Sequence, residues 1–148
     1  MANLAGTIRD AIDSTVGTTV GATYQSLRRV YSPEENDFRN IAKAYGVRFG
    51  SASPVDQILN AYTVDHDFDV LITGRAVNRQ DDADIQTTLT EIYDQIDDIT
   101  VELTRTKIGL PLIVMTVGVP TISAPEFFEN EVVLITATYA VRYRQALK

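Results

Sequence analysis

Three aspartates at alternate positions carry the most suggestive chemistry in this chain. If their segment is extended, Asp65, Asp67 and Asp69 point to the same face of one strand, where like charges repel unless water or a cation lies between them. A calcium-binding loop also begins with alternating acids, but it needs glycine at its sixth place and glutamate at its twelfth, where this chain has Val70 and Ala76. We therefore interpret the three aspartates as a solvent-facing acidic strip and keep a looser divalent-cation site as the alternative.

The single histidine, His66, does not make a catalytic site. A serine triad would depend on it alone, and no serine nucleophile motif accompanies it. The chain has no cysteine, which excludes disulfides, zinc-thiolate sites and cysteine nucleophiles. Gly17 and Gly21 lack the Lys-Ser or Lys-Thr pair that follows in a phosphate-binding loop. We expect no enzymatic activity, no cofactor and no metal, and we expect His66 to be a structural or surface residue.

A long amphipathic helix is predicted for 84–105. Its apolar residues recur at steps of four and three, which places them in one stripe; they are Ile85, Leu89, Ile92, Ile96, Ile99 and Leu103. The polar face carries Asp94, Asp97, Asp98 and Glu102. Three more acids, Asp81, Asp82 and Asp84, suit the electropositive start of the helix, which explains them without a metal.

Four strands and a short first helix surround the long helix. The helix is predicted for 4–14, and glycines and threonines from 15 to 21 break its pattern. Alternating or apolar runs predict strands at 42–50, 64–73, 112–119 and 131–143. The third run is almost continuously apolar, so we expect it to be central or covered on both sides.

The connections between these elements are polar or contain proline. Residues 32–35 have the composition of a helix start, whereas 51–60, containing Pro54, is predicted to be a connection. Residues 120–130, containing Pro125, are predicted to be a long hairpin tip. The resulting order, α-β-β-α-β-β, predicts one α+β domain over 1–148, an antiparallel sheet of two β-hairpins with one long amphipathic helix packed across it.

The charge of the chain limits its partners. The formal net charge of −7 disfavours general nucleic-acid binding, which depends on Lys and Arg at phosphates. Between 56 and 102 the only basic residues are Arg75 and Arg79, so this region is either a solvated acidic face or a surface that repels something negative. No stretch reaches the roughly 18 apolar residues of a membrane span, and the start does not resemble a secretory signal. We expect the chain to act in a cytoplasm or in a particle assembled there.

The order of elements resembles the tail terminator, or tail completion, proteins of long-tailed bacteriophages. Residues 8–12 correspond to the short first helix, 45–49 and 66–72 to the first two strands, 85–103 to the long helix, and 113–143 to the final hairpin with its Tyr-rich last strand. The chain departs from that compact pattern in its longer segment between 17 and 38.

This resemblance implies a structural virion protein without enzymatic activity. Members of the family form a ring, expected to be a homohexamer, on the last ring of the tail tube. The ring ends tube polymerisation and presents a joining surface to the head-side connector or neck protein. The implied partners are therefore further copies of the chain, the tail tube protein and the connector, and DNA passes through without sequence-specific binding. The implied location is the virion neck, assembled in the host cytoplasm.

Position in this plan suggests two sets of functional residues. An acidic channel lining would hold phosphates weakly, and its candidates are Asp65, Asp67, Asp69, Asp94, Asp97 and Asp98. Exposed loops and basic clusters are the candidates for subunit and ring contacts; they are Arg75, Arg79, Asp81, Asp82, Glu126, Phe127, Phe128, Glu129, Arg142 and Arg144.

Two alternatives stay open at this point. Within the same class, the chain could be another neck component, such as a head-completion or stopper protein. From a different class, it could be a small cytoplasmic enzyme that uses the acidic strip with a divalent cation.

Overall fold

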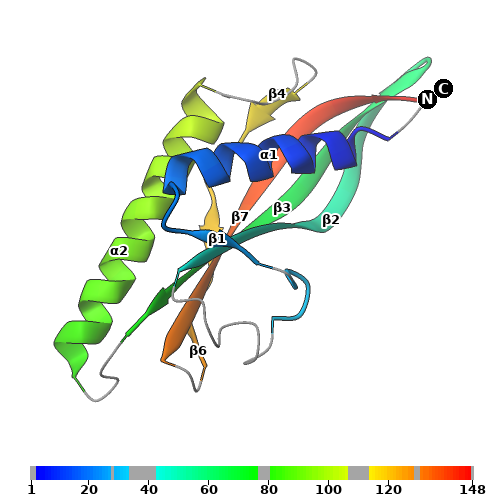
Figure 1. The fold of residues 1–148 in the computed structure, drawn as a ribbon. Helices are drawn as coiled ribbons and strands as arrows, with labels where there is room; N and C mark the ends of the chain where they lie inside the picture. The colour runs from blue at the N-terminus through cyan, green and yellow to red at the C-terminus, as the bar shows by residue number, and fades with distance from the viewer. Residues whose placement is uncertain are drawn as a thin grey trace.

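The computed structural model describes residues 3–27, 29–33, 43–76, 81–106, 114–128 and 131–147. They form an α+β arrangement in which two helices pack on one face of a single sheet (Figure 1). The helices are α1 (Ala5–Val20) and α2 (Asp82–Thr100), and a wide π-helical turn (Val101–Thr106) continues α2. The α+β class is confirmed, but the single-helix description was too simple because α1 is itself a long packing helix.

Three long strands form the centre of the sheet, and four short ones lie at its edges. The order is β1-β2-β3-β7-β4, with β5 and β6 also paired to β7. Their bounds are β1 (Gln25–Ser26), β2 (Ala44–Ile58), β3 (Ala61–Arg75), β4 (Val114–Val117), β5 (Thr121–Ile122), β6 (Glu126–Phe127) and β7 (Val132–Ala146). All pairs are antiparallel except the two-residue pairing of β1 with β2.

Helix α1 extends beyond the predicted end at residue 14. Val16 and Val20 continue the stripe of Ile8 and Ile12 at steps of four, and all four side chains are buried against the sheet. Gly17 lies inside the helix and does not end it. A Cβ at this position would lie 2.7 Å from the hydroxyl oxygen of Tyr45, so the glycine allows α1 to lie close to β2. The helix ends at Gly21, whose positive φ of 86° is readily adopted by glycine.

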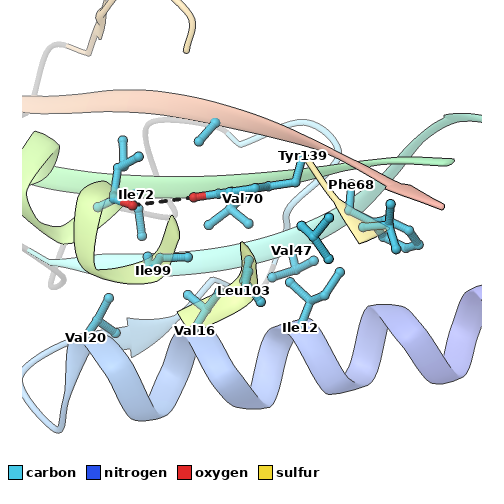
Figure 2. Close-up of a cluster of buried hydrophobic side chains, with 14 of the residues drawn as sticks. Ile12, Val16, Val20, Val47, Phe68, Val70, Ile72, Ile99, Leu103 and Tyr139 are labelled. Carbon is cyan, nitrogen blue, oxygen red and sulfur yellow. Dashed lines mark hydrogen bonds between the residues drawn. The ribbon is translucent and has the colours of Figure 1, made fainter. Parts of the chain in front are cut away.

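The core lies between the two helices and the sheet. Figure 2 shows Ile12, Val16 and Val20 of α1 facing the sheet, with Ile99 of α2 and Leu103 in the same cluster as Val70 and Tyr139. The Tyr139 hydroxyl lies 2.7 Å from that of Thr100, and burial raises the pKa of Tyr139 to about 12. The predicted stripe of the long helix is confirmed as buried from Ile92 to Leu103, whereas Ile85 and Leu89 are half-buried. Asp81 caps the helix by accepting from the Ala83 amide at 3.0 Å.

The opposite face of the sheet is covered over only part of its length. A smaller cluster of Leu27, Leu71 and Leu134 is packed there by Val30 and Phe128. The segment around Val30 lies close to β2, since a Cβ at Gly46 would be 2.4 Å from a Val30 methyl. The remaining part of this face is polar and carries the predicted acidic strip.

The prediction of a connection at 51–60 is wrong. Strand β2 continues to Ile58, a tight turn at Leu59 and Asn60 follows, and β3 begins at Ala61. Pro54 is tolerated because β2 is the outer long strand at this end of the sheet, so the missing N–H interrupts no central ladder. The two strands project beyond the helices as a hairpin, which we call the arm and define as residues 51–63 (Figure 1).

The third predicted strand is also placed differently. The structure has β4 as a four-residue strand at the sheet edge, with Met115 exposed, rather than a central strand. Residues 120–130 are not simply a hairpin tip, because they contain β5 and β6, and both strands pair with β7. Between these strands, Ser123 N donates to Thr136 O at 2.9 Å. The last predicted strand is confirmed as β7, with its alternating face buried. Residues 34 and 35 of the predicted helix start at 32–35 lie outside the described residues.

Candidate assembly surfaces

The predicted acidic strip lies on the open face of the sheet, where arginines from the neighbouring strands meet it. Arg142 of β7 donates to both carboxylate oxygens of Asp65, at 2.7 and 2.8 Å. Arg48 of β2 donates to Asp69 at 3.0 Å, and Thr138 donates to the other oxygen of Asp69 at 2.8 Å. The strip is therefore one row of a charge ladder across three strands, not a bare negative surface.

This ladder changes the electrostatics of the strip. The hydrogen bond from Arg142 holds the pKa of Asp65 below its usual value, and the pKa of Arg142 is raised by the same contact. Asp67 accepts from the Ser51 hydroxyl at 3.3 Å. Periodicity along one strand could not show these partners, because Arg48 is 21 residues from Asp69 in the sequence and Arg142 is 77 residues from Asp65.

The ladder also bears on the divalent-cation alternative. Two of the three carboxylates already bind guanidinium groups, which compete with a metal for the same oxygens. Within the ranges that the structure describes, no group of three acidic or histidine side chains is arranged to hold an ion. The open face therefore carries carboxylates that are already paired with guanidinium groups.

His66 lies in an aromatic cluster at the root of the arm. Its Nδ1 is 3.1 Å from the Tyr143 hydroxyl, and its ring stacks on Phe68 with centroids 4.5 Å apart. The ring of Phe49 completes the cluster, with its centroid 5.8 Å from the centroid of the His66 ring. Burial lowers the pKa of His66, although a backbone hydrogen bond at Gly50 opposes that shift. These are the contacts of a core histidine, in agreement with its structural interpretation.

The outer face of α2 is uniformly acidic or neutral. Asp94, Asp97 and Asp98 are exposed, and the helix contains no Lys or Arg. Glu91 forms an ion pair with Lys43, which also lies 5.7 Å from the ring centre of Tyr24. Unlike the strip on β3, the three aspartates of α2 form no ion pair among those found in the described part of the chain.

The structure brings many of the predicted contact residues to one end of the sheet. Arg75 ends β3 opposite the first residue of β7, Asp81 and Asp82 begin α2, and Phe127 of β6 pairs beside the same end of β7. Phe127 is exposed, as is Glu126, whereas Phe128 is half-buried in the second cluster. Arg79 and Glu129 lie outside the described residues.

The other predicted contact residues lie on β7. Arg142 belongs to the ladder, and Arg144 is exposed one step nearer the arm tip. The candidate set is thus divided between the two ends of the molecule, and the arm end was not recognised from the sequence apart from these arginines.

The arm is the surface that sequence reasoning missed. Every residue of β2 from Ser51 to Ile58 is exposed, and Leu59 in the turn is 87% exposed. Val55 and Ile58 add further exposed apolar area. Pro54 concealed the strand, but the alternation of Tyr62 and Val64 just beyond the Asn60 turn is a signal of strand structure that could have extended β3 to the tip.

The two edges of the sheet differ. Along β7 the edge is broken into β4, β5 and β6, separated by segments that contain Pro120 and Pro125. On the other side, β1 pairs only with the beginning of β2, and the Arg9 guanidinium and Tyr31 hydroxyl bond to Val47 O and Phe49 N. These contacts block further strand pairing near the core but lie short of the arm.

Comparison with known proteins gives a similarity of fold. No family model matches the sequence, and no curated protein matches it. A solved chain from the "Virion of native gene transfer agent (GTA) particle" is similar over 96% of this chain and 98% of that chain, with a TM-score of 0.56 and 13% sequence identity. In the described part of the chain, no helix is both long and apolar enough to cross a membrane. The chain therefore shares a whole-chain α+β fold with a component of a virion particle.

Proposed function

We propose that this chain is a structural virion protein of a phage-like particle, and specifically a tail terminator. In this role it caps the head-proximal end of the tail tube as a ring, ends tube polymerisation and presents the head-side joining surface. The observation that carries the proposal is the fold match, which extends over nearly the full length of both chains. The arrangement of elements that resembles tail terminators supports the finer assignment.

The surfaces of the chain suit a ring that DNA crosses. The face of α2 with Asp94, Asp97 and Asp98 lacks basic residues, so a channel lined by it would repel phosphates. The strip of Asp65 and Asp69 is partly neutralised by its arginines and would suit a channel lining less well. We therefore favour α2 for the channel and assign the charge ladder to contacts with protein.

The first test is the mass and shape of the purified chain. Light scattering and negative-stain imaging should show a ring near six times 16.4 kDa, either alone or after addition of tail tubes from the same particle. Tubes polymerised with the chain present should stop growing and carry a ring at one end. Tubes that keep growing with no chain bound to them would contradict the terminator assignment.

Another neck component, such as a head-completion or stopper protein, is the second candidate, because the name of the similar chain gives the virion particle and not the component. The partner separates the two assignments. A terminator sediments with tail tubes in the absence of heads, whereas a stopper sediments with DNA-filled heads in the absence of tails.

A further inference from the structure

The tip of the arm carries a group of exposed apolar side chains, Ile58, Leu59 and Leu147, which we call the knob. Leu59 exposes 87% of its side chain, and Ile58 beside it is 53% exposed. Leu147 lies at the same end, where its amide donates to Asn60 O at 2.7 Å, and it is half exposed. Nothing in this end of the described chain buries these three side chains, although an aliphatic tip costs solubility.

The conformation of Leu59 is as unusual as its exposure. It is the first residue of a two-residue hairpin turn between Ile58 and Ala61, and its φ is 45°. A positive φ at this place is the geometry of a type II′ turn, which favours glycine. A leucine here weakens the turn and is exposed to water, so its side chain has no evident use in the isolated fold.

The same chain carries an apolar hollow that would receive such a side chain. The hollow has a volume of about 290 Å³ and lies between the start of α1 and the root of the arm. It is lined by Asn3, Ala5, Ala52, Pro54, Tyr62, Val64, His66 and Tyr143. None of these residues carries a carboxylate, a guanidinium or an ammonium group, and burial keeps His66 toward its neutral form.

Charge selects between the surfaces that two copies could share. With a net charge of −7, copies repel one another over most of their surfaces, so a contact between them is best formed by uncharged patches. The knob and the hollow are both uncharged. By contrast, the groove between α1 and α2 is lined by hydroxyls with Asp98 and Glu102, which suits neither an apolar knob nor an acidic neighbour.

We propose that Leu59 at the arm tip of one copy inserts into the hollow of a second copy, between Ala52, Tyr62 and His66. Knob and hollow are different surfaces of one chain, so the contact is head-to-tail, the type that closes into a ring when the rotation per copy allows it. This inference rests on the proposed function, because it supplies a contact for the ring. Occupation of the hollow by Leu59 would also give the strained turn its use.

The absence of native cysteine allows a clean cross-linking test. Leu59→Cys and Ala52→Cys are prepared as separate single variants and mixed before mild oxidation, so that any mixed disulfide joins two copies. The matched control uses Val119→Cys in place of Leu59→Cys. Native Val119 is also an exposed apolar residue, 79% exposed, and it lies at the other edge of the sheet. We expect the mixed dimer to form in the first mixture well above the control. Equal yields in the two mixtures, or only dimers of Leu59→Cys with itself, would overturn the proposal.

A second variant separates assembly from folding. Leu59→Gly places the favoured residue in the turn, so the chain should unfold at the same temperature as the wild type or higher. Self-association should weaken about ten- to a hundredfold for each contact, the loss that fully burying one leucine represents. If wild type and Leu59→Gly form rings equally well, the tip contact is wrong and the proposed ring stands. If the wild type never assembles and the Leu59→Cys mixture cross-links no more than the Val119→Cys mixture, both proposals fail.

Discussion

The body of the molecule and its arm are built from the same strands but differ in the burial of their apolar side chains. In the body, Phe68, Val70 and Ile72 of β3 are completely buried beneath the helices. In the arm, the partner strand β2 is exposed at every position from Ser51 to Ile58, and its apolar residues Val55 and Ile58 have no covering layer. The change occurs within one hairpin, near the bulge between Phe49 and Ala52.

This difference separates residues that the fold requires from residues that a partner requires. A buried apolar side chain is explained by the core that it fills. An exposed aliphatic tip in a strained turn is not, so its explanation lies outside the isolated chain. Substitutions that are costly in the body and harmless in the arm would sharpen this division.

The largest expected effect is in the body. Phe68→Ala should reduce the free energy of unfolding by about 3–5 kcal/mol, because it removes a fully buried ring from between the helices and the sheet. Val55→Ala in the arm should change it by less than about 0.5 kcal/mol, since the side chain is half exposed. Urea unfolding followed by circular dichroism measures both. A comparable loss in the two variants would mean that the arm is part of the folded core.

The next effect concerns the segment that covers the second face of the body. Gly46→Ala should cost about 1–3 kcal/mol, because its methyl would lie 2.4 Å from Val30 and 3.4 Å from Leu27 and would force this segment away from β2. Gly118→Ala is the matched control at the irregular edge, where the nearest atom to a new Cβ is Ala140 O at 3.7 Å. It should cause no loss. Equal stability of the two variants would show that the covering segment adjusts freely.

The body was predicted from the sequence far better than the arm. The stripe of α2 and the alternation of β3 and β7 repeat over many residues, so burial on one side leaves a clear period. The β2 strand of the arm is exposed at every position from Ser51 to Ile58, and Pro54 interrupts it, so the same reasoning predicted a connection where β2 continues. The end of the first helix was predicted too early for a related reason. Gly17 was interpreted as a helix breaker, whereas it allows α1 to lie close to Tyr45, a residue distant in sequence.

The candidate surfaces were predictable only in part. The acidic residues could be located, but their partners could not, because Arg48 and Arg142 reach Asp69 and Asp65 through strand pairing. Residues at element ends, such as Asp81, were placed correctly as a helix start. The hollow at the root of the arm combines side chains from α1, β2, β3 and β7, an arrangement that no local pattern records.

A smaller effect is expected from acid at the boundary between body and arm. His66 has a lowered pKa in the folded chain because it is buried, so the unfolded chain binds a proton more readily. The free energy of unfolding should therefore be highest above about pH 6.5 and decrease as the pH falls from there toward the lowered folded pKa. His66→Phe should remove this component of the pH dependence, measured by urea unfolding between pH 5 and pH 8. An unchanged profile would place the imidazole in water rather than in the aromatic cluster.

The smallest effect is expected from the charge ladder at the root of the arm. Arg142 lowers the pKa of Asp65 in the folded chain, so the pair stabilises the fold above about pH 3.9, the ordinary pKa of the carboxyl, and this contribution disappears as the pH falls toward the lowered value. Asp65→Asn should therefore be slightly less stable than wild type at pH 7, and the difference should be smaller near pH 3. Both partners are partly exposed, so 1 M salt should also reduce the difference at pH 7. Asp67→Asn is the control, because the native Asp67 carboxylate accepts from the Ser51 hydroxyl and not from an arginine. Its difference in stability from wild type should depend less on salt. If Asp65→Asn differs from wild type by the same amount at both pH values, the contribution of Asp65 is one of packing and the ladder does not link β3 to β7 by charge.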